Sequence, residues 1–226
     1  MTPAGAASGP PLSLALPEQD GLIESSVVEH AGLTVGLARA GGTWRLVAGA
    51  AGPDALQGFE GEVTRDADGR ARFVGPASPR NAEALRVALP WLTPRPIGLH
   101  TSVGFGDRLG LATPGHVQAL RSSAPGIAPV FAQQSMREMT RTGRTPKDVI
   151  DAATWGALAG GWRGQVGADA DHLKSLADIE RCAAAGYSLF PIDPGEHVDG
   201  TADVADGSTL RDRLVHLPWA ALEDDE

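Results

Sequence analysis

The segment GQVGADADHLK, residues 164–174, joins a short apolar run to a dense group of polar and charged side chains. Residues 165–168 predict a short buried strand, because small and apolar residues are bounded there by glycine and by charge. Four side chains able to do chemistry follow the end of that strand: Asp169, Asp171, His172 and Lys174. The segment therefore predicts a strand that ends in a functional site.

A helix is predicted to begin directly after this polar group. The hydroxyl of Ser175 can cap free backbone amides, and Asp178 falls in the first turn, where the helix dipole favours an anion. Folds that alternate strands and helices place catalytic groups at the carboxyl ends of their strands. Asp171 and His172 are therefore the main candidates for a functional site.

The order of strand, polar turn and helix recurs on both sides of this segment. Helix starts are predicted at Thr113 and Thr145, each a threonine cap followed by a proline at the first helical position. The further strands are predicted at residues 97–103, 126–132 and 187–192. This alternation predicts an α/β fold with a parallel sheet. Because a closed barrel needs about 250 residues, we expect a partial TIM-barrel-like (βα) repeat over residues 96–226.

The preceding part of the chain differs in composition. Residues 1–20 are rich in proline, glycine, alanine and serine, and we expect a poorly ordered tail. Residues 21–95 predict a small β-rich region, with hairpin turns at Gly41-Gly42 and at residues 66–69. A helix is expected over residues 81–89.

Composition limits the classes of function. The 226-residue chain has a formal net charge of −9, which argues against nonspecific binding to nucleic acid or anionic membranes. Its one cysteine, Cys182, excludes an internal disulfide and is expected to lie in the core. No apolar run approaches the roughly 20 residues of a membrane span, and residues 1–17 lack the basic start of a secretory signal. We expect a cytoplasmic protein.

The carboxyl ends of parallel strands meet at one edge of a sheet, so further polar residues should gather near Asp171. Arg108 can grip a substrate carboxylate through its two-pronged donor geometry, or it can pair with Asp107 or Asp169. The same edge should also hold Gln133-Gln134 and the turn Asp193-Pro-Gly-Glu196-His197. Of these, Arg108, Gln133 and Lys174 are the candidates for substrate binding.

Two other motifs have a structural and a functional interpretation. Residues 104–110 read GxGxxxG, one residue off the dinucleotide-binding pattern, which favours a sharp turn over a nucleotide site. Arg137, Arg141 and Arg144 have helical spacing and can attract an anion, although such a row is more often a solvated helix face. We therefore assign no ligand to either motif from spacing alone.

Asp171 and His172 together are suited to a divalent metal site. Carboxylates and a neutral imidazole are common ligands of Mn, Zn, Ni and Fe ions, and a nearby carboxylate can act as a base. Adjacent strand residues point in opposite directions, so both side chains can share a site only where the chain has left the strand. The alternative is that these are solvated loop residues.

Three longer motifs carry a family resemblance: residues 104–116 (GFGDRLGLATPGH), 131–146 (FAQQSMREMTRTGRTP) and 167–174 (GADADHLK). Together they resemble the tagaturonate epimerase family, over roughly residues 97–200. The resemblance implies a metal-dependent isomerase with a barrel-like α/β fold, which interconverts D-tagaturonate and D-fructuronate by C4 epimerisation. Asp171 then matches the proton-accepting base and His172 a metal ligand.

Family members are longer than this chain, which resembles an N-terminal half. The resemblance places the other metal ligands and the proton-donating acid in the part that is absent here. We therefore expect either a hexuronate epimerase that is truncated and inactive alone, or a non-catalytic fragment that binds sugar acids. An uncovered sheet edge would also favour self-association.

Overall fold

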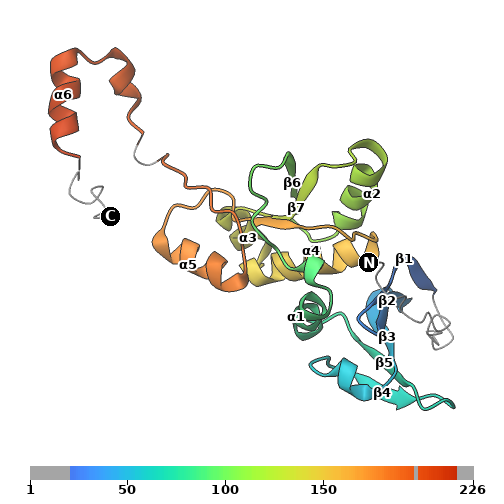
Figure 1. Ribbon diagram of the computed structural model, residues 1–226. Coiled ribbons are helices and arrows are strands. Elements are labelled where there is room, and N and C mark those ends of the chain that lie inside the picture. The colour runs from blue at the N-terminus through green and yellow to red at the C-terminus, as the bar shows by residue number, and fades with distance from the viewer. Residues whose placement is uncertain (1–20, 196–197, 218–226) are drawn as a thin grey trace, which may run out of the picture. The chain divides into compact units, whose positions relative to one another are not determined.

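The computed structural model describes residues 21–195 and 198–217. The chain forms two compact units, one ending at Ile192 and one beginning at Asp193. Glu196 and His197, which the sequence suggested as further ligands, lie outside the described residues. The first unit contains two sheets and carries the candidate site (Figure 1).

An antiparallel sheet forms the first part of the chain, as predicted. Its described strands are β1 (Leu22–His30), β2 (Leu33–Ala40), β3 (Thr43–Ala50), β4 (Glu62–Arg65) and β5 (Ala71–Pro76), in the order β1-β2-β3-β5-β4. Gly41 and Gly42 form the β2–β3 turn with φ of 56° and 81°, a conformation that glycine adopts without steric cost. The predicted turn at residues 66–69 joins β4 and β5.

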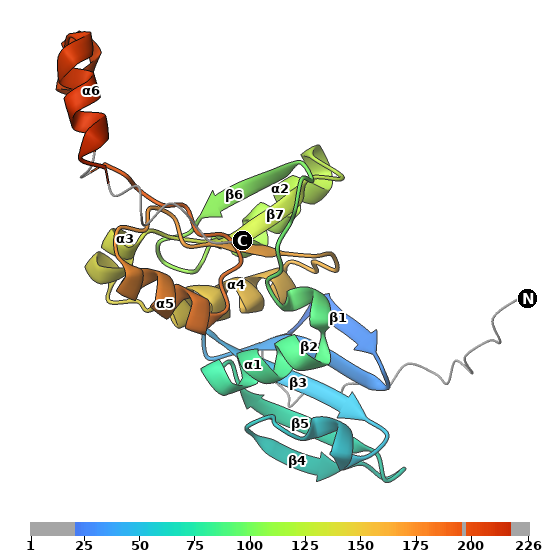
Figure 2. The same ribbon diagram turned by 60° about the vertical axis from the view of Figure 1, so that its left-hand side comes forward.

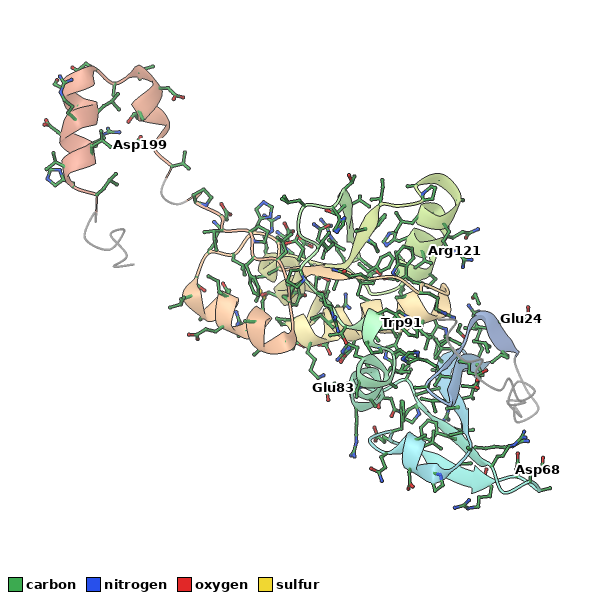
Figure 3. All side chains as sticks on the ribbon, viewed as in Figure 1. Glu24, Asp68, Glu83, Trp91, Arg121 and Asp199 are labelled. Carbon is green, nitrogen blue, oxygen red and sulfur yellow. The ribbon has the colours of Figure 1, made fainter. Side chains whose placement is uncertain are left out.

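The first helix, α1 (Pro79–Ala88), begins two residues before the predicted start, because Ser78 caps it and Pro79 occupies its first turn. A short 3-10 helix, η2 (Pro90–Leu92), follows. Its Trp91, labelled in Figure 3, contacts His30 of β1 edge to face, with 5.1 Å between the ring centroids. These contacts connect the antiparallel sheet to the rest of the unit.

The second sheet is parallel, as the strand–helix alternation predicted. Its described strands are β6 (Ser102–Gly106), β7 (Ala128–Gln133) and β8 (Gly167–Asp169), in sequence order. The prediction of a strand over residues 187–192 was wrong. That segment forms only single bridges, Asp169 to Leu189 and Leu173 to Ile192. The strand predicted over residues 97–103 lies later, so that the glycines of the GxGxxxG motif fall partly within β6.

Helices connect these strands. They are α2 (Thr113–Ser123), α3 (Met136–Thr142), α4 (Pro146–Ala159) and α5 (Leu176–Ala185). Thr145 and Asp148 form a reciprocal capping box at the start of α4, and Ser175 caps α5 as predicted. Thr113 does not cap α2, because it is already the first helical residue and Asp107 binds the preceding amides.

Helix α4 is the centre of the first unit. Most of its 14 residues are buried, which is typical of a helix that is covered on all sides. It contacts β7, α2 and α5 on one part of its surface and β1, β2 and α1 on another. Figure 2 shows α4 between the two sheets. Both sheets therefore share one apolar core, which includes Leu37, Phe73, Phe131, Ile150 and Leu158.

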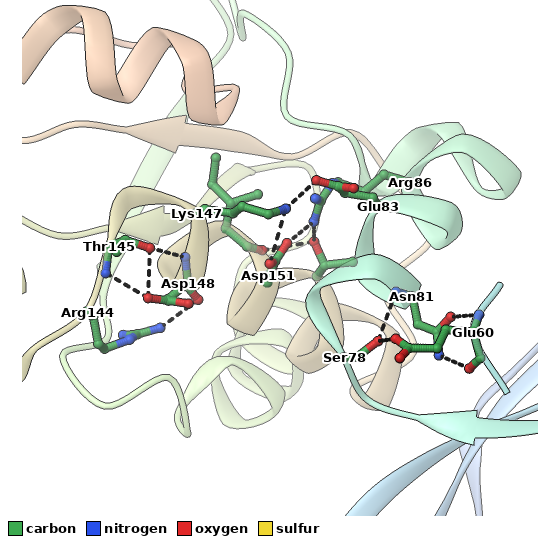
Figure 4. Close-up of polar contacts among 12 residues, drawn as sticks. Glu60, Ser78, Asn81, Glu83, Arg86, Arg144, Thr145, Lys147, Asp148 and Asp151 are labelled. Carbon is green, nitrogen blue, oxygen red and sulfur yellow. Dashed lines mark hydrogen bonds and ion pairs between the residues drawn. The ribbon is translucent and has the colours of Figure 1, made fainter. Parts of the chain in front are cut away.

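A polar network joins α1 to α4 at the edge of this core (Figure 4). The guanidinium Nη1 of Arg86 donates to Oδ1 of Asp151 at 2.8 Å and to Oγ1 of Thr154 at 2.9 Å. Lys147 bonds both Asp151 and Glu83. The side chains of Arg86 and Asp151 are only 12% and 7% exposed, so this ion pair is largely removed from solvent.

The second unit contains a 3-10 helix, η3 (Gly200–Val204), and helix α6 (Gly207–Val215). Asp206 caps α6, and the amide of Thr209 together with the Ser208 hydroxyl lowers the pKa of this carboxyl to about 2. Arg213 of α6 pairs with Asp199 before η3.

The structure confirms a mixed α/β fold in which an antiparallel sheet precedes a parallel one. It does not confirm the TIM-barrel-like prediction, because the parallel sheet has three strands in the described part of the chain. None of the described helices combines the length and the apolar character needed to cross a membrane.

Candidate functional site

The carboxyl ends of the three parallel strands lie side by side. Gly106 of β6 is paired with Gln133 of β7, and Gln133 is paired with Asp169 of β8. The polar residues that follow these strands are therefore brought to one edge of the sheet, as their order in the sequence predicted. We refer to this edge as the carboxyl rim.

Asp169 organises the centre of the carboxyl rim. Its Oδ2 accepts a 2.7 Å hydrogen bond from Nε2 of Gln133, and its Oδ1 accepts one of 2.9 Å from the backbone N–H of Asp171. Its side chain is buried and each of its carboxylate oxygens has a partner. Asp169 therefore acts as a structural residue that fixes both Gln133 and the turn after β8.

The chain leaves the strand at that turn in a strained conformation. Asp171 and His172 have φ angles of 41° and 59°, in the left-handed region that residues with a Cβ rarely adopt. Such conformations are often found at functional sites, where the surrounding structure holds them in place. This turn brings the two adjacent side chains to the same side, as a shared site requires.

The side chains of Asp171 and His172 form a close pair. Nδ1 of His172 lies 2.5 Å from Oδ1 of Asp171, and a carboxylate can only accept, so Nδ1 carries the donated proton. In the neutral imidazole, Nε2 then keeps its lone pair on the other side of the ring. The side chains are 67% exposed for His172 and 32% for Asp171, so both can meet a ligand from solvent.

Gly104 makes room for the Gln133 side chain. A Cβ placed on Gly104 would lie 2.5 Å from both Nε2 and Oε1 of Gln133, closer than atoms can approach. Gly104, the first glycine of the GxGxxxG motif, therefore leaves the space that the end of the Gln133 side chain occupies. This gives the motif a structural role at the carboxyl rim.

Replacing Gly104 by alanine is expected to displace Gln133 and to break its hydrogen bond to Asp169. The buried Asp169 carboxylate would then lack one of its donors, which costs about 1–3 kcal/mol in the free energy of unfolding. Urea denaturation of the Gly104→Ala variant measures this loss. Gly106→Ala is the matched control, because a Cβ there meets nothing within 4 Å. Equal stability of the two variants would contradict the packing role of Gly104.

Asp107 has a structural function. Its carboxylate accepts hydrogen bonds from the amides of Gly110, Leu111 and Ala112, at 2.8, 3.1 and 2.8 Å. Burial opposes ionisation, but these donors outweigh it and lower the pKa of Asp107. Asp107 therefore stabilises the fold above its unfolded pKa of about 3.9, and this contribution is lost as the pH falls through the lower folded value.

Arg108 does not pair with Asp107 or Asp169, the two partners suggested by the sequence. Its Nε lies 3.3 Å from Oε2 of Glu138 in α3, and its side chain is 70% exposed. A pocket of about 500 Å³ opens beside it. The pocket is lined by Gly106, Asp107, Arg108, Leu109, Leu111 and Ala112.

Glu138 lies at the carboxyl rim, and the sequence did not single it out as a candidate site residue. Ser135 caps α3 through the amide of Glu138, so the pattern Ser-x-x-Glu marked only a helix start. In the structure the Glu138 carboxylate is buried and also contacts Arg137 and Arg141. The signal that would have identified it is an acidic residue within a row of arginines.

Other predicted residues have different surroundings. Lys174 is exposed in the segment before α5. Gln134 is buried and has a structural role, since it bonds Thr142 and Arg144. Cys182 is fully buried beside Met136, and burial raises the pKa of its thiol, which agrees with the predicted core position.

The donor chemistry at the rim suits a metal ligand at one position. Asp171 orients His172 as carboxylates often orient metal-binding imidazoles, with the second nitrogen left for the ion. Within residues 21–195 and 198–217, no three His, Cys, Asp or Glu side chains lie close enough together to hold an ion. The described residues thus do not form a complete metal-ligand set by themselves.

Comparison with known proteins identifies the family. The family model described as UxaE, tagaturonate epimerase, matches residues 25–222. A tagaturonate/fructuronate epimerase from Thermotoga maritima is 46% identical over 153 residues, which cover 68% of this chain and 31% of that protein. The matched residues thus span about a third of the length of this relative.

Solved structures agree with this result. The native crystal structure of the fructuronate-tagaturonate epimerase UxaE from Cohnella laeviribosi has a TM-score of 0.76 and 35% sequence identity. The similarity covers 90% of this chain and 40% of that one. A crystal structure of the same enzyme complexed with one glycerol has a TM-score of 0.75. The chain belongs to the tagaturonate epimerase family.

Proposed function

We propose that this chain contributes the catalytic base and a metal ligand to the epimerisation of D-tagaturonate and D-fructuronate. The observation that carries the proposal is the pair Asp171 and His172. A strained turn at the end of β8 holds them within hydrogen-bonding distance and partly open to solvent. Relatives named for this epimerisation support the substrate class.

The carboxyl rim suggests a role for each residue. Asp171 is the base, and His172 is a ligand of a divalent cation through Nε2. Gln133 is held by Asp169, so its amide is already oriented when a substrate hydroxyl arrives. Arg108 and Lys174 bind the substrate carboxylate. A divalent cation bound here would polarise the substrate carbonyl and stabilise negative charge that develops on its oxygen.

The chemistry of the substrates favours a retro-aldol route. The two sugar acids differ at C4, which is β to the C2 ketone, so the C4 hydrogen is not acidified by that ketone. Asp171 would accept the proton of the C4 hydroxyl while the C3–C4 bond breaks, giving a C4 aldehyde and a three-carbon enediolate. Rotation of the aldehyde and re-formation of the bond, with return of the proton, give the epimer.

Direct proton exchange at C4 is the competing route. The reaction in D2O separates the two mechanisms, because only proton exchange introduces deuterium at C4. Mass spectrometry and NMR of the recovered product therefore test the retro-aldol route. We expect C4 to keep its hydrogen.

The His172→Ala variant tests the metal site. We expect it to bind Mn²⁺ or Zn²⁺ at least about tenfold more weakly than the wild type. Mutating a residue that only hydrogen-bonds to a metal ligand already weakens metal binding by about that factor. Isothermal titration calorimetry measures the change. His216→Ala is the control, because His216 is also exposed but bonds a backbone carbonyl in α6. Equal affinity of wild type and His172→Ala would exclude His172 as a ligand.

A sugar-acid-binding fragment without catalysis is the second candidate. It is favoured by the incomplete ligand set of the described residues and by the match to 31% of the Thermotoga relative. An epimerase assay combined with a binding titration separates the two candidates. Binding without turnover in the presence of divalent cations would favour the fragment.

A further inference from the structure

A buried carboxylate gathers three arginines next to the carboxyl rim. Oε1 of Glu138 lies 2.8 Å from Nη1 of Arg141 and 3.6 Å from Nε of Arg137. Oε2 lies 3.3 Å from Nε of Arg108. The Glu138 side chain is 10% exposed, whereas those of the arginines are 63–74% exposed. We call these four residues the arginine cluster.

The arginine cluster has an excess of positive charge. One carboxylate neutralises one of three guanidinium groups, and no other ion pair of these arginines is found among the described residues. The neighbouring Asp107 carboxylate is engaged by backbone amides. This local excess of positive charge would attract an anion, although the net charge of the chain is −9.

The geometry leaves donors available for a ligand. In these contacts each arginine uses one nitrogen towards Glu138: Nε in Arg108 and Arg137, and Nη1 in Arg141. A guanidinium has five N–H donors, so most of them stay directed elsewhere. Carboxylates are well matched to such donors, because their two oxygens accept parallel hydrogen bonds.

The cluster also lies where a substrate would be held. Arg108 directly follows β6, and α3, which carries the other three residues, directly follows β7. Figure 2 shows β6 pointing towards the side of the unit where α3 lies. Because β6, β7 and β8 are parallel neighbours, the cluster and the Asp171–His172 pair follow strands that end at the same rim.

We propose that the arginine cluster binds the carboxylate of the hexuronate and thereby selects sugar acids over neutral sugars. Glu138 is a positioning residue that holds the three guanidinium groups together. The inference rests on the proposed function for the identity of the substrate. It extends the substrate contacts from Arg108 to Arg137 and Arg141, and so gives the arginine row of α3 a role in specificity.

The test is a titration of the 226-residue chain followed by NMR of the arginine Nε–H groups. D-Fructuronate is the probe, with D-fructose and fructose 6-phosphate as neutral and phosphate-bearing analogues. We expect D-fructuronate to shift the signals of Arg108, Arg137 and Arg141 and to bind more tightly than either analogue. Tighter binding of the phosphate, absence of D-fructuronate binding, or shifts confined to other residues would overturn the proposal.

Two variants give the matched comparison. Arg141→Gln should weaken D-fructuronate binding by roughly fivefold to tenfold, the loss of one partly exposed charged contact, and leave fructose binding unchanged. Arg181→Gln is the control, since Arg181 also pairs with an acidic residue three positions earlier and is 61% exposed, against 63% for Arg141. Equal weakening in both variants would contradict a specific site.

The Glu138→Gln variant distinguishes the positioning of the guanidinium groups by Glu138 from simple attraction by the net charge of the cluster. The variant adds positive charge, so simple attraction predicts tighter binding, whereas loss of positioning predicts weaker binding, which is the expected result. Arg141→Lys should recover part of the affinity.

The binding assay also separates this inference from the proposed function. If the chain binds uronate in a charge-dependent way but does not convert it, catalysis by this chain alone is rejected. If Arg141→Gln converts the substrate with an unchanged KM, the role of the arginine cluster in substrate binding is rejected.

Discussion

Replacing Asp171 by asparagine is expected to lower the kcat of epimerisation by about 10²–10⁴, the usual contribution of a general base. Asparagine keeps the size of the side chain and tolerates the left-handed backbone found here, so the fold should be preserved. It cannot accept a proton from the substrate. KM should change little, because the proposed substrate contacts belong to other residues.

The steady-state rate of D-fructuronate conversion measures this loss. Asp68→Asn is the control, because Asp68 is exposed in the turn between β4 and β5 and should leave the rate unchanged. Circular dichroism of both variants shows whether the fold is retained. A folded Asp171→Asn variant with wild-type kcat would remove Asp171 from the reaction.

Replacing Arg86 by methionine is expected to reduce the free energy of unfolding by about 3–5 kcal/mol, the typical effect of breaking a buried ion pair. Methionine retains much of the apolar length of the arginine. It leaves the buried Asp151 carboxylate without its 2.8 Å partner. Burial already raises the pKa of Asp151, and Arg86 opposes this rise, so the remaining charge would be poorly compensated.

Denaturation in urea measures the effect. Arg80→Met on the same helix is the control, because Arg80 is exposed and its one hydrogen bond within the described part of the chain is a long bond to the Gly58 carbonyl. The double variant Arg86→Met with Asp151→Leu should regain much of the lost stability, since it also removes the buried carboxylate that has lost its arginine partner. If Arg86→Met were as stable as Arg80→Met, the network between α1 and α4 would have no role in holding the two sheets together.

Local signals in the sequence were sufficient to predict most of the helices, strands and turns. The capping of α4 by Thr145 and of α5 by Ser175, and the glycine turn between β2 and β3, depend on neighbouring residues. Segments whose secondary structure depends on contacts with residues far away in the sequence were harder to predict. Residues 187–192 have strand composition, but they make only isolated bridges to residues at and after the end of β8.

In the candidate site too, features set by neighbouring residues could be predicted, whereas features set by distant contacts could not. The position of Asp171 and His172 after a strand could be inferred from the sequence, and the structure confirms that they are close together. The contact of Arg108 with Glu138 could not, since it joins residues that follow different strands. The sequence also did not show that Asp107 accepts hydrogen bonds from the amides of the loop before α2, because this role depends on the path of the loop after β6.

The most direct test of the account is the conversion of D-fructuronate by the purified chain, followed by NMR in the presence of Mn²⁺, Zn²⁺, Ni²⁺ or Fe²⁺. Our account predicts that D-tagaturonate signals grow with at least one of these ions and do not grow with Asp171→Asn. Absence of conversion with every ion, or undiminished conversion by Asp171→Asn, would contradict the assignment of catalysis to the Asp171–His172 pair.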